Sequence, residues 1–174
     1  MIPRLLLVFL LFTSVAWAQR DDDAFVGAKA PELKAGTLWI NSAPLTLESL
    51  KGKVVMLDFW AFDCENCAEA MPHVLDLYKK YGKDGLVIIG VHTPRIDYEK
   101  DLAKIKEDVA KKGIQYPVVV DNKYSIWSDY LCDAWPNVFV IDQEGVIQLS
   151  HTGVGRYDDI DKVVQKLLAK KPSK

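Results

Sequence analysis

The segment from Val54 to Tyr81 constrains the fold of this chain more than any other. Val54 to Trp60 is almost entirely apolar, which is typical of a strand buried on both faces in an α/β sheet. Two cysteines separated by two residues, Cys64-Glu65-Asn66-Cys67, come next, and apolar residues then recur at helical spacing as far as Tyr81. The pattern predicts a central strand, a turn and a helix, with both cysteines in the first helical turn, where they can close a disulfide.

The remaining chain predicts an alternation of strands and helices. We expect further strands over residues 37–40, 86–91, 118–120, 137–142 and 146–151, and further helices over residues 97–112, 124–131 and 157–168. The last two strands are expected to form a hairpin, because only the turn residues Gln143-Glu144-Gly145 separate them. This order predicts an α/β fold with three layers, α/β/α, around a mixed central sheet.

Residues 1–18 have the features of a secretory signal peptide. Arg4 supplies an early positive charge, Leu5 to Val15 is an apolar run, and Ala16-Trp17-Ala18 has the small-x-small pattern of a cleavage site. The apolar run is too short to span a bilayer, which takes about 20 residues. We therefore expect cleavage after Ala18 and a mature protein that is periplasmic or secreted and does not span a membrane.

The composition indicates one globular domain. Hydrophobic residues make up 49% of the chain and charged residues 26%, which is ordinary for a globular protein. We expect a flexible lead-in over residues 19–30, a single domain over residues 31–169 and a frayed basic tail over residues 170–174. The net charge of −2 becomes −3 when the leader takes Arg4 with it. Since the chain also has no basic stripe, nucleic acid is not expected as a partner.

Three cysteines are an odd number for a framework of structural disulfides. Cys64 and Cys67 form a natural pair and leave Cys132, which we expect to be a small buried apolar residue. A zinc site would need Cys132 or a histidine to join the pair, and the sequence has no second pair of cysteines. The pair itself indicates thiol–disulfide exchange, because the positive end of the helix dipole favours a thiolate on Cys64.

The stretch from Val55 to Cys67, together with Pro72 and the later Trp135-Pro136, resembles the thioredoxin superfamily. Leu86 to Pro94 and Tyr116 to Asp121 are similar to the secreted TlpA/DipZ-type members of that superfamily. The resemblance extends over nearly the whole predicted domain. It implies a thioredoxin-like α/β/α sandwich and a chemistry of disulfide exchange.

The resemblance also assigns roles to single residues. It implies that Cys64, exposed at the helix N-terminus, is the nucleophile and that Cys67 is the resolving thiol. Asp58 matches a buried acid that passes protons to and from Cys67, and burial would raise its pKa toward the working pH. Pro136 matches a cis-proline beside the disulfide, which leaves the backbone of Trp135 free to pair with an extended substrate segment.

The motif departs from the family pattern in its charge. Asp63 stands where Trp is common before the first cysteine, and Glu65 adds a carboxylate inside the motif. Both negative charges oppose the helix dipole and disfavour a thiolate on Cys64, which makes the couple more reducing. We expect Asp63, Glu65 and Asn66 to tune the redox behaviour, and the protein to be a thiol reductant rather than a disulfide-forming oxidant.

Further candidates are a histidine and three aromatic residues. His92 follows the strand over residues 86–91, and parallel strands present ligand sites at their carboxyl ends. It is therefore a candidate for a place near Cys64, with an ordinary core or surface histidine as the alternative. Trp60, Phe62 and Trp135 are candidates for an apolar rim that contacts a protein substrate, with burial in the core as the alternative.

By this resemblance the chain is a secreted or periplasmic oxidoreductase that acts on protein disulfides and needs no cofactor or metal. A membrane-embedded thiol electron donor is the implied partner. Two alternatives stay open. A peroxidase of the peroxiredoxin kind requires Pro-x-x-x-Thr-x-x-Cys, but Ala61 occupies the Thr position. A copper-delivery protein would use Cys64, Cys67 and His92 or His151 as ligands, although related copper carriers space their cysteines by three residues.

Overall fold

The computed structural model describes residues 25–33 and 38–170. Within these residues, one mixed sheet is formed by six strands, β1 (Leu38–Ile40), β2 (Val54–Trp60), β3 (Leu86–His92), β4 (Val118–Val120), β5 (Asn137–Ile141) and β6 (Ile147–Thr152). Their order across the sheet is β1-β4-β3-β2-β5-β6. β2 is parallel to β3 and antiparallel to β5, and β4 is parallel to β3. The edge strands β1 and β6 both pair antiparallel.

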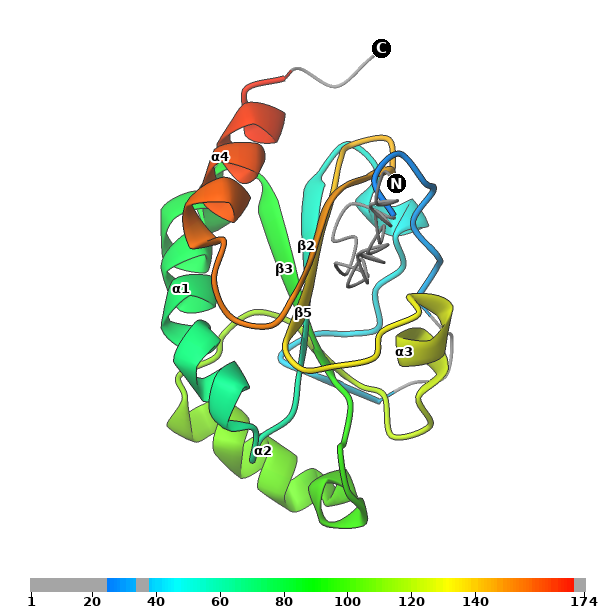
Figure 1. Ribbon diagram of the computed structural model, residues 1–174, viewed down its shortest axis with the longest axis vertical. Coiled ribbons are helices and arrows are strands. Elements are labelled where there is room, and N and C mark those ends of the chain that lie inside the picture. The colour runs from blue at the N-terminus through cyan, green and yellow to red at the C-terminus, as the bar shows by residue number, and fades with distance from the viewer. Residues whose placement is uncertain (1–24, 34–37, 171–174) are drawn as a thin grey trace, which may run out of the picture.

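Helices cover both faces of this sheet. The α-helices of the described residues are α1 (Glu65–Tyr81), α2 (Leu102–Lys111), α3 (Ser125–Asp129) and α4 (Tyr157–Leu168), and short 3-10 helices are η1 (Glu48–Leu50), η2 (Gly82–Asp84) and η3 (Asp97–Lys100). Figure 1 shows α1 and α4 on one side of the sheet and α3 on the other. α2 buries its apolar side chains in the same core cluster as α1 and α4. The predicted order of strands and α-helices and the three-layer architecture are confirmed.

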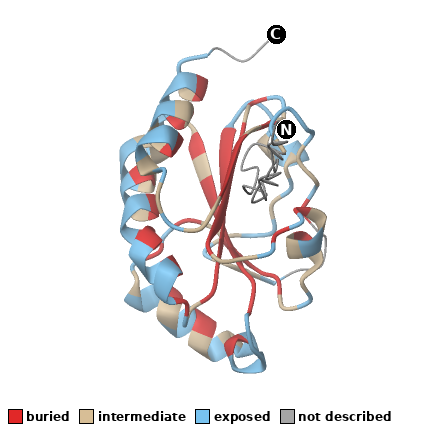
Figure 2. Ribbon diagram, viewed as in Figure 1, coloured by how far each residue is buried: buried red, intermediate tan, exposed pale blue. Residues whose placement is uncertain are grey.

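The central strand β2 is buried along its whole length (Figure 2). Successive side chains of a strand point to opposite faces of the sheet. Met56 and Trp60 belong to the core cluster beneath α1 and α4, whereas Leu57 and Phe59 belong to the cluster on the face of α3. Asp58 is in phase with Met56 and Trp60, so its side chain lies on the α1 face. Both motif cysteines belong to that same cluster.

The helix predicted over residues 97–112 is interrupted. Asp101 is the N-cap of α2, and its carboxylate accepts hydrogen bonds from the N–H groups of Ala103 (2.9 Å) and Lys104 (3.3 Å). An aspartate that caps a helix in this way starts a new one, which is why η3 forms a separate turn before it. The consequence for the site is that Glu99, in η3, is buried instead of facing solvent on a surface helix.

The packed body begins earlier than the sequence predicts. Within the expected lead-in, Gly27 donates its N–H to the carbonyl of Ile147 (2.8 Å), and Ala30 donates to the carbonyl of Gly145 (2.9 Å). Phe25 packs edge-on against Phe139. Residues 25–30 are therefore part of the packed body. The expected signal peptide and residues 171–174 of the tail lie outside the described residues. Among the residues that are described, no helix has the length and apolar character to cross a membrane.

Candidate active site

Cys64 and Cys67 are joined in a disulfide at the start of α1, with their Cα atoms 5.2 Å apart. Cys64 is the N-cap residue, and its Sγ accepts a hydrogen bond from the N–H of Cys67 (3.2 Å). The expectation of an exposed Cys64 is wrong for this oxidised form, because Cys64 is only 5% exposed and Cys67 only 2%. The two residues are covered by the core cluster on the α1 face, and Cys64 borders a surface cleft.

That cleft is where a substrate sulfur can approach Cys64. Its lining consists of Cys64, Glu65, Asn66, Arg95, Asp133, Ala134 and Trp135. Asp63, Glu65 and Asn66 are all exposed, so the three positions expected to tune the redox behaviour lie at or beside the mouth of the site. Cys67 is not part of this lining.

Asp58 lies in the buried interior on the same face of the sheet as the disulfide. It is 2% exposed, and burial, which disfavours the charged carboxylate, raises its pKa from 3.8 to about 7. Its Oδ2 atom has no hydrogen-bond partner among the described residues. Gly90 pairs with Asp58 in the sheet, and a Cβ atom at Gly90 would lie 2.9 Å from Nε1 of Trp60 and 3.2 Å from Cε2 of Tyr116. Large buried rings therefore crowd the space next to Asp58.

The peptide bond between Trp135 and Pro136 is cis, as the family resemblance implies. Trp135 is half-buried: its ring stacks on Trp127 at 4.0 Å between centroids, and its Nε1 donates to the carbonyl of Thr93 (2.9 Å). Trp135 lines the cleft of Cys64, whereas Pro136 lines a second cleft, between α1 and α4. The bond thus separates two depressions of the surface.

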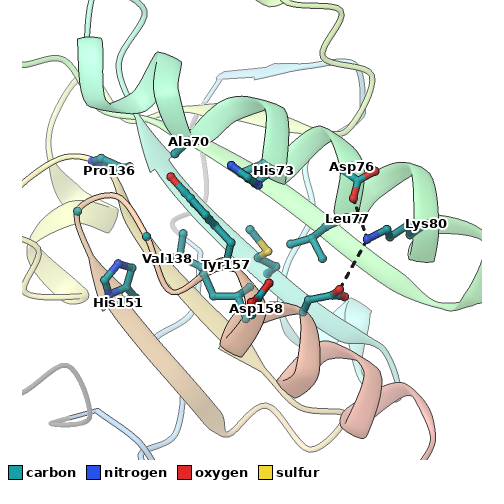
Figure 3. Close-up of a pocket in the computed structure, with 16 residues that line it drawn as sticks. Ala70, His73, Asp76, Leu77, Lys80, Pro136, Val138, His151, Tyr157 and Asp158 are labelled. Atoms are coloured by element: carbon teal, nitrogen blue, oxygen red, sulfur yellow. Dashed lines mark ion pairs between the residues drawn. The ribbon is translucent and has the colours of Figure 1, made fainter.

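The second cleft has a volume of about 100 Å³. Figure 3 shows Pro136, Ala70, His73 and Tyr157 among the residues that line it, and the rings of His73 and Tyr157 stack on each other. The centroids of these two rings are 3.6 Å apart. His73 and His151 both line this cleft and not that of Cys64. The sequence gives no indication of where these two histidines lie.

His92 contacts the turn that carries Cys64. Its Nε2 accepts a hydrogen bond from the N–H of Phe62 (3.3 Å), and its ring stacks on the ring of Phe62 at 5.8 Å. Burial, which disfavours the imidazolium, lowers the pKa of His92 from 6.5 to about 4. His92 is thus a neutral acceptor behind the turn. Trp60 is fully buried in the core and does not form a rim, whereas Phe62 is partly buried.

Sequence reasoning missed three residues at this turn. Arg95 donates from Nη2 to the carbonyl of Asp63, and its guanidinium is paired with the buried Glu99. Lys112 donates from Nζ to the carbonyl of Phe62 (3.4 Å). One signal was available: Arg95 follows the carboxyl end of β3, next to the strand that leads to Cys64, and Glu99 stands four residues later.

The structure gives the alternative metal sites no support. Among the described residues, no three His, Cys, Asp or Glu side chains come together as a group able to hold a metal ion, so neither His92 nor His151 completes a ligand set with the motif cysteines. Cys132 is 8% exposed and unpaired, as a buried apolar cysteine is expected to be, and burial raises the pKa of its thiol far above the ordinary range.

The sequence model of the AhpC/TSA family matches residues 26–150, which is more than half of the chain. The chain belongs to the AhpC/TSA family. The matched residues include β1 to β5, the motif cysteines and Pro136. The chain has the buried residue Ala61 at the position where a peroxiredoxin signature has Thr.

Relatives of this AhpC/TSA member include thiol–disulfide oxidoreductases. Protein DipZ of Mycobacterium bovis is 42% identical over 142 residues, which cover 80% of this chain and 20% of DipZ. Thiol-disulfide oxidoreductase YkuV of Bacillus subtilis is 33% identical over 140 residues, which cover 80% of this chain and 93% of YkuV. The first curated relatives are much longer proteins, of which this chain spans about a fifth or less.

A solved structure shows the same fold. The solution structure of a thioredoxin-like protein in the oxidized form has a TM-score of 0.73 to this chain and is 32% identical. The match covers 82% of this chain and 96% of that protein. The resemblance to the thioredoxin superfamily and to its DipZ-type members, first seen in the sequence, is confirmed.

Proposed function

We propose that this protein is a thiol–disulfide oxidoreductase that exchanges disulfides with protein substrates through Cys64 and Cys67. The observation that carries the proposal is the placement of the disulfide: it lies at the N-terminus of α1, on the edge of an open cleft, with the cis peptide bond of Trp135-Pro136 beside that cleft. This chain matches 93% of the length of YkuV, which is named a thiol-disulfide oxidoreductase.

The two thiols have different tasks. In the reducing direction, the Cys64 thiolate attacks a substrate disulfide, the first substrate sulfur leaves as a thiolate that takes up a proton, and a mixed disulfide remains. The Cys67 thiolate then attacks Cys64, the second substrate sulfur leaves, and the protein disulfide forms. Two electrons pass from the protein to the substrate. Cys64 takes the first step because it borders the cleft, and Cys67 is not part of its lining.

Asp58 accepts the proton that Cys67 must lose in the second step and returns it in the reverse reaction. Burial raises the pKa of Asp58 to about 7, so near neutral pH the carboxyl is present in both forms. A group that transfers protons in both directions works best when its pKa lies near the working pH. The backbone of Trp135 supplies an edge to which an extended substrate segment binds.

The protein works as a reductant. Two exposed carboxylates, Asp63 and Glu65, flank Cys64, and negative charge next to a thiol disfavours its thiolate and destabilises the reduced form. Measuring the redox equilibrium with glutathione tests this direction. A potential as oxidising as that of a DsbA-type enzyme would contradict it.

The protein reaches its substrates outside the cytoplasm. The signal peptide predicted over residues 1–18 supports this location. Because the compartment is oxidising, the protein must be reduced again after each reaction, and a membrane-embedded thiol protein is the electron donor that we propose. The N-terminal residue of the mature protein decides the point. Cleavage after Ala18 leaves Gln19 first, and a protein that keeps Met1 in cells would contradict secretion.

The central experiment traps substrates with Cys67→Ala. Without the resolving thiol, mixed disulfides between Cys64 and substrate proteins persist and can be isolated from cells. The matched control is the double variant Cys64→Ser/Cys67→Ala, which should trap nothing. If Cys67→Ala traps no protein, and the wild-type protein also fails to reduce a test disulfide, the proposed function is wrong.

A further inference from the structure

The turn Phe62-Asp63, directly before Cys64, is held by side chains from three other segments. The N–H of Phe62 donates to Nε2 of His92 at the end of β3 (3.3 Å). The carbonyl of Phe62 accepts from Nζ of Lys112, which follows α2, and the carbonyl of Asp63 accepts from Nη2 of Arg95. Because a turn leaves its backbone groups without partners from a helix or sheet, these contacts satisfy them and fix the position of the turn.

Arg95 is itself held in place by a buried carboxylate. Glu99 is fully buried, and its Oε1 accepts from Nε (3.1 Å) and Nη2 (3.0 Å) of Arg95. Its Oε2 accepts from the backbone N–H of Arg95 and, at 3.4 Å, from that of Ile96. A planar guanidinium makes such a forked contact, and an ammonium cannot. Buried ion pairs are weak evidence for a role in stability alone, so the pair calls for a second explanation.

Arg95 also faces the cleft of the reactive sulfur. Its side chain is 35% exposed and lines that cleft together with Cys64, whereas Glu99 is not part of the lining. The positive end of the ion pair therefore lies at the cleft that Cys64 borders. The other charged groups around the cleft are the carboxylates of Glu65, Asp133 and, one residue before Cys64, Asp63. Arg95 is the one cation in the lining among the described residues.

We propose that Arg95, anchored by Glu99, is a positioning residue that fixes the carbonyl of Asp63 and presents a positive charge to Cys64. The inference rests on the proposed exchange of disulfides at Cys64 and names a residue that regulates it. The fixed turn keeps Cys64 at the N-terminus of α1, and the charge offsets the nearby carboxylates. Arg95 thereby keeps part of Cys64 in the thiolate form near neutral pH, in surroundings that are otherwise acidic.

The test is the double variant Arg95→Gln/Glu99→Gln, which removes both charges and leaves no buried charge without a partner. The pKa of Cys64 is measured as the pH dependence of alkylation of the reduced full-length protein, with the site of alkylation located by mass spectrometry. A unit charge several ångströms away changes a pKa by about 0.5 in a water-like medium. Since Glu99 offsets part of the charge of Arg95, we expect the pKa of Cys64 to rise by about 0.3 to 0.5.

The reaction rate gives a second readout. A higher pKa lowers the fraction of thiolate near neutral pH but makes that thiolate more nucleophilic, so the two effects partly cancel. Attack of the double variant on a small disulfide should therefore slow by no more than about twofold from the charge alone. A larger loss of rate, in a variant whose Cys64 keeps the wild-type pKa, would indicate that the turn has moved.

Three further variants separate charge from structure. Glu99→Gln alone leaves Arg95 without its counter-ion and should lower the pKa of Cys64, the opposite sign. Arg95→Lys keeps the charge and should keep the pKa within about 0.2 of the wild-type value. Lys100→Gln/Asp97→Asn removes an exposed ion pair of the same 3-10 helix that does not line the cleft, and it should change neither the pKa nor the rate.

The outcomes distinguish the inference from the proposed function. An unchanged pKa of Cys64 in both Arg95→Gln/Glu99→Gln and Glu99→Gln would overturn the inference, and Arg95 would then only neutralise Glu99. If the double variant does not fold, Glu99→Gln still tests the inference, because the pKa of Cys64 should then fall. A wild-type protein that reduces no disulfide would overturn the proposed function, and the pKa measurement, which needs no turnover, would still test the placement of Arg95.

Discussion

Replacing Asp58 by Asn should stabilise the protein at alkaline pH, and the gain should disappear in acid. Burial raises the pKa of Asp58 from 3.8 to about 7, so the folded protein holds a proton there more tightly than the unfolded chain does. The stability linked to this proton is complete below the unfolded pKa of 3.8 and is lost as the pH rises through about 7. The difference in pKa corresponds to about 4 kcal/mol of unfolding free energy.

The assay is urea denaturation of the oxidised wild-type protein and of Asp58→Asn at several pH values between about 4 and about 8. Near pH 4 both side chains are neutral and similar in size, so the two proteins should have similar free energies of unfolding. Near pH 8 the variant should be more stable by up to about 4 kcal/mol, because the wild-type protein then contains a buried carboxylate without a charged partner. Taking the difference between the two proteins cancels every other titrating group.

Asp84→Asn is the matched control, since it removes one exposed carboxylate from η2, away from the disulfide. Its difference from the wild-type protein should not follow the curve of Asp58→Asn. A stability difference for Asp58→Asn that stays constant between about pH 4 and pH 8 would refute the assignment of a raised pKa to Asp58. Asp58→Asn should also slow release of the substrate from Cys64 while leaving the first attack intact.

Three further predictions concern the surroundings of the site. His92→Gln keeps an acceptor for the N–H of Phe62 and removes the buried imidazole. Because the pKa of His92 is lowered to about 4, the free energy of unfolding of the wild-type protein should fall by about 3 kcal/mol as the pH drops from about 6.5 to about 4. Urea denaturation across this pH range should show no such loss in the variant. Gly90→Ala places a Cβ atom 2.9 Å from Nε1 of Trp60 and should destabilise the protein by about 1 to 3 kcal/mol, measured by urea denaturation. Cys132→Ala should cost about 1 kcal/mol of stability and leave disulfide exchange unchanged; a loss of exchange would give Cys132 a redox role.

The sequence is sufficient for those parts of the fold and site that depend on local pattern. β2 is recognisable because all of its residues but Asp58 are apolar, and the one polar residue in such a strand stands out. The position of both cysteines follows from the strand that precedes them and the helical spacing that follows. The cis bond at Pro136 could be predicted only through the resemblance to a family, since the local sequence Trp135-Pro136 is also compatible with a trans bond.

The remaining features of the site depend on contacts between segments far apart in the chain. Arg95 contacts the carbonyl of Asp63 across 32 residues, and Lys112 reaches the carbonyl of Phe62 across 50. Both contacts are made to backbone carbonyls, so the side chains of residues 62 and 63 give no sign of them in the sequence. The burial of Glu99 could not be foreseen either, because the helical pattern of residues 97–112 conceals the break that Asp101 causes.

The two motif thiols are made unequal by surroundings of opposite kinds. On the inner side, Asp58 and His92 are buried, and burial favours the neutral form of each side chain. It raises the pKa of Asp58 to about 7 and lowers the pKa of His92 to about 4. Between about pH 4 and about pH 7 both side chains are mainly neutral, and the low dielectric behind the disulfide disfavours a thiolate on Cys67. Only the ionised form of Asp58, which becomes populated near pH 7, can accept the proton of Cys67. On the outer side, Cys64 borders a cleft that exposes Arg95 and several carboxylates to solvent. Substitutions in the cleft should therefore alter the pKa of Cys64 and its rate of attack, whereas substitutions at Asp58 should alter the rate at which Cys67 resolves the mixed disulfide.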